Sequence, residues 1–326
     1  MNVWRSWKKL LARQETGGVL ACFRIAVGFV ILITLANILY CDVAEIIWTD
    51  QSYAGYRKLN GNHVINLFGG PSPTVINTFL GVGLLSSFLT MVGLGGRASI
   101  FFCLQMYIGL HRLNGEASGS SDIVITNALW ILFLSSSTKT LSVDCWLKTR
   151  KWSSGELISS WPRYLAILQL VWMYSTTGWQ KISAHWLPGG GSTALHYIFQ
   201  QPNWARFDTS FILEWTLMTR FFTATTWVWE STAVLLLLYY YYRNTEKATS
   251  RLGRLMTRFD LRLPFALIGL GFHISIMLVM VVGPFSPISM TLYLCLFHPE
   301  EYRRAKTWLR NHVMLTKTVF GVEPNQ

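Results

Sequence analysis

The chain is divided by a series of apolar runs, most of which approach the length of a membrane-crossing helix. A bilayer core requires about 20 consecutive apolar residues in one helix. Apolar residues make up 51% of the chain and charged residues only 13%, too few charges for the surface of a soluble domain of this size. The sequence therefore predicts an all-α, polytopic transmembrane helix bundle. The runs lie at 18–40, 74–95, 98–113, 123–137, 163–182, 221–242, 264–283 and 286–297.

These runs also predict how the chain is organised. The fourth and eighth runs are short, so we expect about eight spans, with seven as the alternative. Residues 1–14 interleave Trp4 and Trp7 with Arg and Lys, which predicts an amphipathic helix at the membrane interface. We expect a membrane domain over 15–300 and a basic cytoplasmic tail over 301–326.

The basic residues predict the orientation. With eight spans and an inner N-terminus, 21 of the 28 Lys and Arg residues fall on the inner side, five outside and two within spans, whereas the acidic residues are divided almost evenly. This is the positive-inside pattern, and it predicts that both termini are cytoplasmic. The net charge of +12 is then a matter of topology, so we expect the lipid bilayer, and no nucleic acid, as a partner.

Cysteines and metal-binding patterns carry little information here. The five cysteines show neither disulfide nor zinc spacing. We therefore predict no metal site, and we interpret the cysteines as packing residues or inert thiols.

Four ionisable residues within the predicted spans are singled out, because a charge there is costly and is a functional candidate by default. They are Arg24, Lys181, Glu230 and His273. Glu230 and His273 lie at similar depth, roughly 14 Å from opposite boundaries, so we expect them to meet as a proton donor and acceptor or as a pair that fixes helix packing. Arg24 lies close enough to the inner boundary to reach the headgroups.

The densest polar group begins at Tyr174. Tyr174, Gly178, Lys181 and His185 recur at helical spacing, which predicts one shared helix face. Gly178 leaves room for another helix or a flat ligand, and Lys181 next to it can act as a base when desolvated or extend towards the headgroups. After it comes the longest predicted external segment, 183–220, which is suited to covering an active site or binding a partner.

These residues resemble the HTTM (horizontally transferred transmembrane) domain family, which includes the vitamin K-dependent γ-glutamyl carboxylase. The resemblance is most specific where Gly178, Lys181 and Trp186 keep the family's Gly-x-x-Lys…Trp spacing. Its other parts are Arg24 with Gly28, Leu141-Ser142-Val143-Asp144, Trp229-Glu230, and His273 with Met277.

The resemblance implies a membrane enzyme with a quinone or hydroquinone cofactor. Lys181 would be the base that deprotonates the quinol, assisted by Glu230, His273 and Asp122; Ser121 or Asp122 occupies the place of the carboxylase's assisting histidine. The substrate-binding residues would be Tyr174, Gly178, Trp186, Arg24 and His185. The extramembrane region that binds the carboxylase's protein substrates has no counterpart, so glutamate carboxylation of the animal kind is not expected.

Two other functions remain open. The chain is also similar to the sporulation-delaying protein B group, which implies a non-catalytic factor that matures a secreted antimicrobial peptide with a partner protein, in the bacterial inner membrane. A transporter is the third interpretation, although no paired broken helices or inverted repeat favours it.

Overall fold

The computed structural model describes residues 3–305 and 307–308. The predicted tail from 309 onward lies outside the described residues. The described chain is mostly helical, as predicted, and one antiparallel pair of short strands, β1 and β2, interrupts it. The elements are α1 Val3–Leu11, β1 Gln14–Thr16, α2 Gly18–Tyr40, α3 Ala44–Trp48, α4 His63–Asn66, α5 Pro73–Val92, α6 Gly96–His111, α7 Ser120–Leu134, α8 Val143–Thr149, β2 Leu157–Ser159, α9 Trp161–Gln180, α10 Ala194–Ile198, α11 Ser210–Leu213, α12 Thr216–Ser231, α13 Leu235–Asn244, α14 Arg251–Arg258, α15 Arg262–Val279 and α16 Phe285–Tyr293, with short 3-10 turns between some of them.

Every predicted apolar run is helical. Three helices, α2, α5 and α15, are long and apolar enough to cross a membrane, and the bent pair α12 and α13 makes a fourth if it counts as one span. Helix α7, and α16 with its 3-10 extension, are apolar but shorter. The expectation of one continuous helix over 221–242 was wrong.

A side-chain hydrogen bond accompanies the break between α12 and α13. The hydroxyl of Thr232 donates to the carbonyl of Val228 at 2.7 Å, a bond of the kind that often bends helices, although equivalent bonds lie within α2 and α9, which are unbroken. The two parts meet at 46°. Helix α12 can therefore follow α9 while α13 turns away towards α1 and α14.

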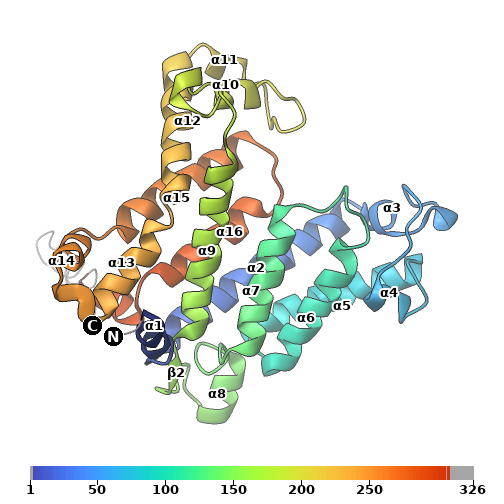
Figure 1. Ribbon diagram of the computed structural model, residues 1–326. Helices are drawn as coiled ribbons and strands as arrows, with labels where there is room; N and C mark the ends of the chain where they lie inside the picture. The colour runs from blue at the N-terminus through green and yellow to red at the C-terminus, as the bar shows by residue number, and fades with distance from the viewer. Residues whose placement is uncertain (1–2, 306, 309–326) are drawn as a thin grey trace, which may run out of the picture.

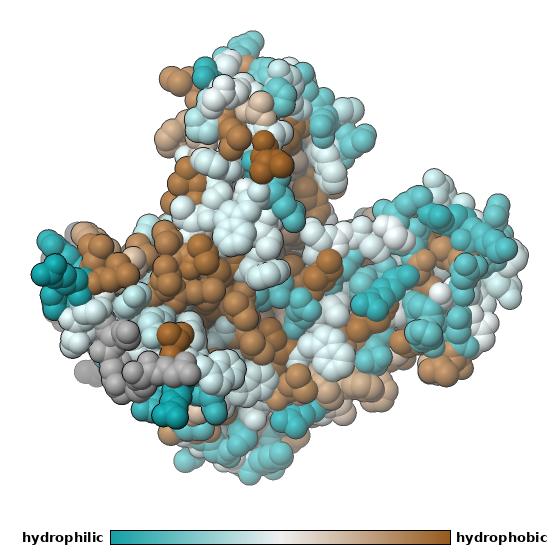
Figure 2. Space-filling view, in the orientation of Figure 1, coloured by the Kyte–Doolittle hydropathy of each residue, from teal (hydrophilic) through white to brown (hydrophobic). Residues whose placement is uncertain are grey.

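The helices form two arms that diverge from a common base (Figure 1). One arm contains α9 and α12 and ends at α10 and α11, and the other contains α2, α5 and α6 and ends at α3 and α4. The base holds α1, α8, α14 and the β1–β2 pair. Hydrophobic residues lie mainly along the helices, whereas hydrophilic residues concentrate at the arm tips and the base (Figure 2), as expected of helices that expose apolar side chains to lipid.

Candidate functional site

Lys181 and Glu230 form an ion pair between α9 and α12. Lys181 is the C-cap of α9, directly after its last residue Gln180. Its ammonium donates to Oε2 of Glu230 and lies 4.7 Å from the centre of the Trp186 ring. The side chains are 15% and 3% exposed. Burying two charges in such a pair costs desolvation free energy, so the surrounding helices must hold the two side chains in place.

The close crossing of α9 and α12 at Gly178 holds the Lys181–Glu230 pair in place. A Cβ at Gly178 would lie 2.5 Å from the backbone nitrogen of Ser231 and 2.8 Å from the carbonyl carbon of Glu230. The indole of Trp179 donates to the carbonyl of Ser231 at 3.1 Å. The space beside Gly178 is thus filled by a helix, which brings the Glu230 carboxylate within reach of Lys181.

A second polar group lies deeper, between α9, α15 and α16. The hydroxyl of Tyr174 is 2.5 Å from Nε2 of His273 and accepts a hydrogen bond from the hydroxyl of Tyr293 at 2.8 Å. Nδ1 of His273 is 3.2 Å from the hydroxyl of Ser286. His273 is completely buried. Both nitrogens of its ring therefore have a hydroxyl partner, and the four side chains form a continuous series of hydrogen bonds.

The predicted contact between Glu230 and His273 was wrong. Among the described residues, Glu230 pairs with Lys181 and His273 bonds Tyr174 and Ser286. Glu230 and His273 lie at similar depth but do not meet, because their side chains face different neighbouring helices. The two polar groups are nevertheless adjacent, because the ring of Trp229, the residue before Glu230, packs on that of Tyr174.

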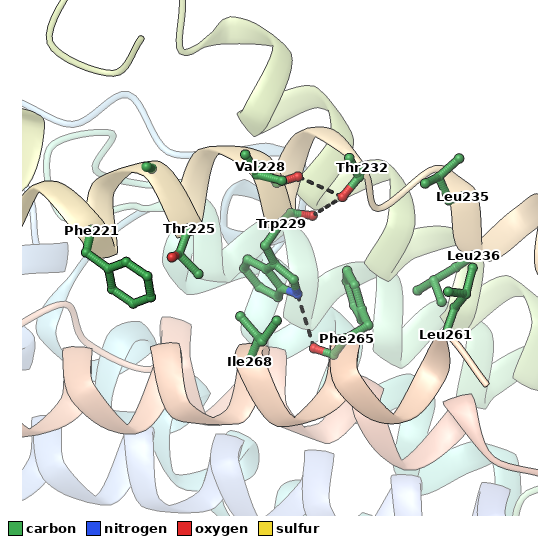
Figure 3. A pocket seen from close by; sticks show the side chains of 11 residues that line it. Phe221, Thr225, Val228, Trp229, Thr232, Leu235, Leu236, Leu261, Phe265 and Ile268 are labelled. Carbon is green, nitrogen blue, oxygen red and sulfur yellow. Dashed lines mark hydrogen bonds between the residues drawn. The ribbon is translucent and has the colours of Figure 1, made fainter. Parts of the chain in front are cut away.

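Trp229 separates these groups from a groove on the bundle surface. Its ring is 4.4 Å from that of Tyr174 and 5.1 Å from that of Phe265, and its indole donates to the carbonyl of Phe265 at 3.1 Å. On the other side it lines an apolar groove of about 460 Å³ between α12, α13 and α15 (Figure 3). Phe221, Val228 and Ile268 line the same groove. Hence an apolar molecule in the groove would contact the residue that covers Tyr174.

His185 lies apart from this site. Since α9 ends at Gln180, the predicted helix face shared by Tyr174, Gly178, Lys181 and His185 was wrong beyond Gly178. The triple-glycine turn that follows folds back: Nδ1 of His185 is 2.9 Å from the hydroxyl of Thr193, and its ring packs on Tyr197. The same early helix end is what turns Trp186 under the Lys181 ammonium.

Arg24 is fully buried at the end of α5, on the other side of the bundle core. It donates to the carbonyls of Thr90, Met91 and Leu141 at 2.7, 3.0 and 2.6 Å. Gly93 adopts a positive φ of 72° beside the guanidinium, leaving no room there for a side chain. The guanidinium thereby satisfies carbonyls at a helix end that would otherwise be unpaired.

Asp122 belongs to a separate polar group between α6 and α7. It accepts hydrogen bonds from the hydroxyl of Tyr107 at 2.6 Å and from the backbone of Gly119 at 2.7 Å. Nδ1 of His111 lies 4.0 Å away. No interaction with Lys181 is present among the described residues, so Asp122 is held at the start of α7 by neighbours of its own.

Sequence reasoning missed Tyr293 and Ser286. Both lie in the last predicted span, which contains no charged residue, and no residue there was singled out. Hydroxyls within apolar runs were the available signal, because a buried hydroxyl requires a hydrogen-bond partner.

Comparison with known proteins gives one match. Residues 13–302, nearly the whole chain, match the sequence model of the HTTM domain, which confirms the resemblance. No curated protein and no solved structure matches the chain.

Proposed function

The chain belongs to the HTTM domain family and is a membrane protein with several apolar helices; on this premise we propose that it is an integral membrane enzyme acting on a lipophilic quinol. Lys181 is the base, and Glu230 holds and adjusts it. The observation that carries the proposal is the buried Lys181–Glu230 pair beside Trp186.

The pair can supply a neutral amine. In the ion pair, Lys181 carries the proton; transfer of that proton to Glu230 leaves an amine and a carboxylic acid, both uncharged. A low-dielectric site favours the neutral forms. The amine then takes the proton from a quinol hydroxyl, which leaves the quinol as an anion next to the Lys181 ammonium.

Two neighbouring features suit this chemistry. Trp186 offers a flat face to a ring bound next to Lys181. The groove beyond Trp229 is apolar and open along the bundle surface, so it suits the tail of a lipid-soluble substrate. A proton can move onward from the neighbourhood of Glu230 through the side chains of Tyr174, His273, Tyr293 and Ser286.

We propose that the membrane orientation follows the basic residues. All eight apolar helical segments would lie in the membrane, the shorter ones packed among their neighbours, with both termini at the cytoplasmic side. The membrane would be the inner membrane of a bacterial cell, and Lys181 then lies near the outer face of that membrane.

The test uses the full chain in lipid nanodiscs with vitamin K hydroquinone as the probe. We expect oxygen-dependent consumption of the quinol, and a decrease of about 100-fold or more with Lys181→Arg, as for loss of a general base. Lys58→Arg, an exposed position on the α3–α4 arm, is the matched control. Full turnover by a correctly folded Lys181→Arg variant would exclude Lys181 as the base, and no turnover by the wild type would exclude the quinol.

The exposed aromatic residues at the tip of the arm that contains α9 and α12 favour a second candidate, a non-catalytic factor that binds a secreted peptide. Phe207, Phe211 and Trp215 are each about half exposed; the rings of Phe207 and Phe211 stack, and Phe211 meets Trp215 edge to face. Such contiguous exposed apolar surface marks interaction sites. If Phe207→Ser with Phe211→Ser abolished peptide maturation while Lys181→Arg left it intact, this candidate would replace the enzyme.

A further inference from the structure

A polar pocket of about 200 Å³ lies at the base of the bundle, at the opposite end of α9 from Lys181. It is formed where α9 and α15 begin and α13 ends. Four arginines and two glutamates line it, together with tyrosines and other polar side chains. Its basic and aromatic lining is Arg163, Arg243, Arg262, Arg304, Tyr164 and Tyr240.

The floor of this pocket is rigid. Nη2 of Arg163 bonds Glu15 at 2.9 Å, and Arg262 holds Glu301 through two bonds of 2.7 Å. The two arginine side chains are 3% and 4% exposed. Arg262 therefore neutralises one of the two lining glutamates, and the other, Glu300, lies 3.4 Å from Arg303.

The rim differs from the floor because its cations are less engaged. Arg304 is exposed, and its side chain makes no hydrogen bond or ion pair with any residue in the part of the chain that the structure describes. Arg243 donates to the hydroxyl of Tyr239 and lies at 3.5 and 3.6 Å from Asp260 and Glu301, both long contacts. An anion entering the pocket would thus meet the guanidinium of Arg304 and those donors of Arg243 that Tyr239 does not engage.

Two short amphipathic helices place the pocket at the depth of lipid headgroups. Helices α1 and α14 both contact α13, whose last residues line the pocket, and both lie at the base of the molecule (Figure 1). Trp4 of α1 is 65% exposed, and Leu252 and Leu255 of α14 are 43% and 53% exposed, next to basic residues on the same helices. Helices of this composition lie in the membrane interface.

We propose that this pocket binds the phosphate-bearing headgroup of an anionic phospholipid from the leaflet that contacts α1 and α14. Arg304 and Arg243 contact the phosphate, above a floor whose two arginines are held in place by carboxylates. Basic pockets between transmembrane helices are suited to anionic headgroups. A lipid is favoured over a soluble anion because the interfacial helices bring the leaflet to the pocket mouth.

The test measures lipid retained by the full chain after purification in mild detergent, by native mass spectrometry with phosphatidylglycerol or phosphatidylcholine supplied. We expect preferential retention of phosphatidylglycerol, weakened roughly fivefold by Arg304→Gln and further by Arg304→Glu, since one interfacial cation contributes about 1 kcal/mol. Lys148→Gln, which removes an exposed charge from α8 at the same base, should retain lipid as the wild type does.

Two results would overturn the proposal. Equal retention by the Arg304→Gln and Lys148→Gln variants would mean that only overall charge matters. Displacement of the lipid by inorganic phosphate at equal concentration would assign the pocket to a soluble anion. Neither result depends on catalysis, so the pocket and the quinol chemistry at Lys181 can fail separately.

Discussion

The two ends of α9 carry two buried ion pairs that differ in how fully they are bonded. At the start, Arg163 engages both oxygens of Glu15 at 2.9–3.0 Å and donates also to the carbonyl of Cys295 at 3.3 Å. At the end, Lys181 contacts one oxygen of Glu230 and the face of Trp186. Exposure follows the same order, 3% for the Arg163 side chain and 15% for that of Lys181.

The difference separates a structural charge from a reactive one. A guanidinium with its donors engaged by a carboxylate and a carbonyl has little capacity left for a ligand, and it does not lose its proton. An ammonium with one carboxylate partner keeps donors free, and lysine shifts its protonation readily when buried. Charge and burial alone, which the two residues share, would have assigned them the same role.

The strongest test of this comparison is Arg163→Met. It removes the three hydrogen bonds that Arg163 donates to the buried Glu15 and leaves Nε2 of His298 at 3.7 Å as its neighbour, so we expect a loss of about 3–5 kcal/mol in unfolding free energy, measured by thermal or denaturant unfolding in detergent. Arg163→Met combined with Glu15→Leu should recover most of that loss. The remaining folded protein should keep its quinol turnover; a turnover defect in the stable double variant would contradict a purely structural role.

Lys181→Met should give the opposite balance. We expect a smaller loss of stability, about 1–3 kcal/mol, since the pair has fewer bonds and some solvent access, together with complete loss of turnover. Adding Glu230→Leu should restore stability but no activity. If stability and turnover recovered together, the pair would be a packing device like Arg163–Glu15, and the comparison would fail.

The sequence predicted the helices better than the contacts between them. Helical runs were predictable because apolar length and composition are local properties. The partners of Glu230 were not, because Lys181 lies 49 residues away and depth along a helix says nothing about which side of the helix a residue faces. Arg163 was counted only as a topological charge, since nothing near it in the sequence points to Glu15.

The early end of α9 was equally hidden from the sequence. Helical spacing continues from Tyr174 through His185, and Gly178 within it was correctly expected to admit a close neighbour. The sequence Pro188-Gly189-Gly190-Gly191 indicates a turn, but it does not indicate that the helix ends before Lys181. At that boundary the indole of Trp179 donates to the carbonyl of Ser231 in α12, a tertiary contact that a local pattern does not reveal.

Gly178→Ala tests whether the close helix crossing is what supports the reactive pair. A Cβ 2.5 Å from the Ser231 backbone nitrogen must push α12 away, and overpacking of this kind costs about 1–3 kcal/mol. Turnover should fall more than stability, because Glu230 moves with α12. Gly271→Ala in α15, where an added Cβ meets no atom within 4 Å, is the matched control and should leave both unchanged or slightly raise stability; equal effects of the two variants would deny the crossing this role.

The smallest expected effect concerns Asp260, at the same base as Arg163. Burial alone would raise the pKa of Asp260, but hydrogen bonds from Arg262 and its charge outweigh burial and lower the pKa to about 2. A carboxyl with a lowered pKa stabilises the fold above its unfolded pKa of about 4, and this contribution is lost as the pH falls towards 2. Because the side chain is 39% exposed, solvent screening should limit the effect to less than about 1 kcal/mol. Between pH 6 and pH 3, the unfolding temperature of Asp260→Asn should therefore fall slightly less than that of the wild type. A larger fall for the variant would mean that Arg262 relies on Asp260 less than on Glu301. The base would then be held by fewer bonds than the comparison assumes.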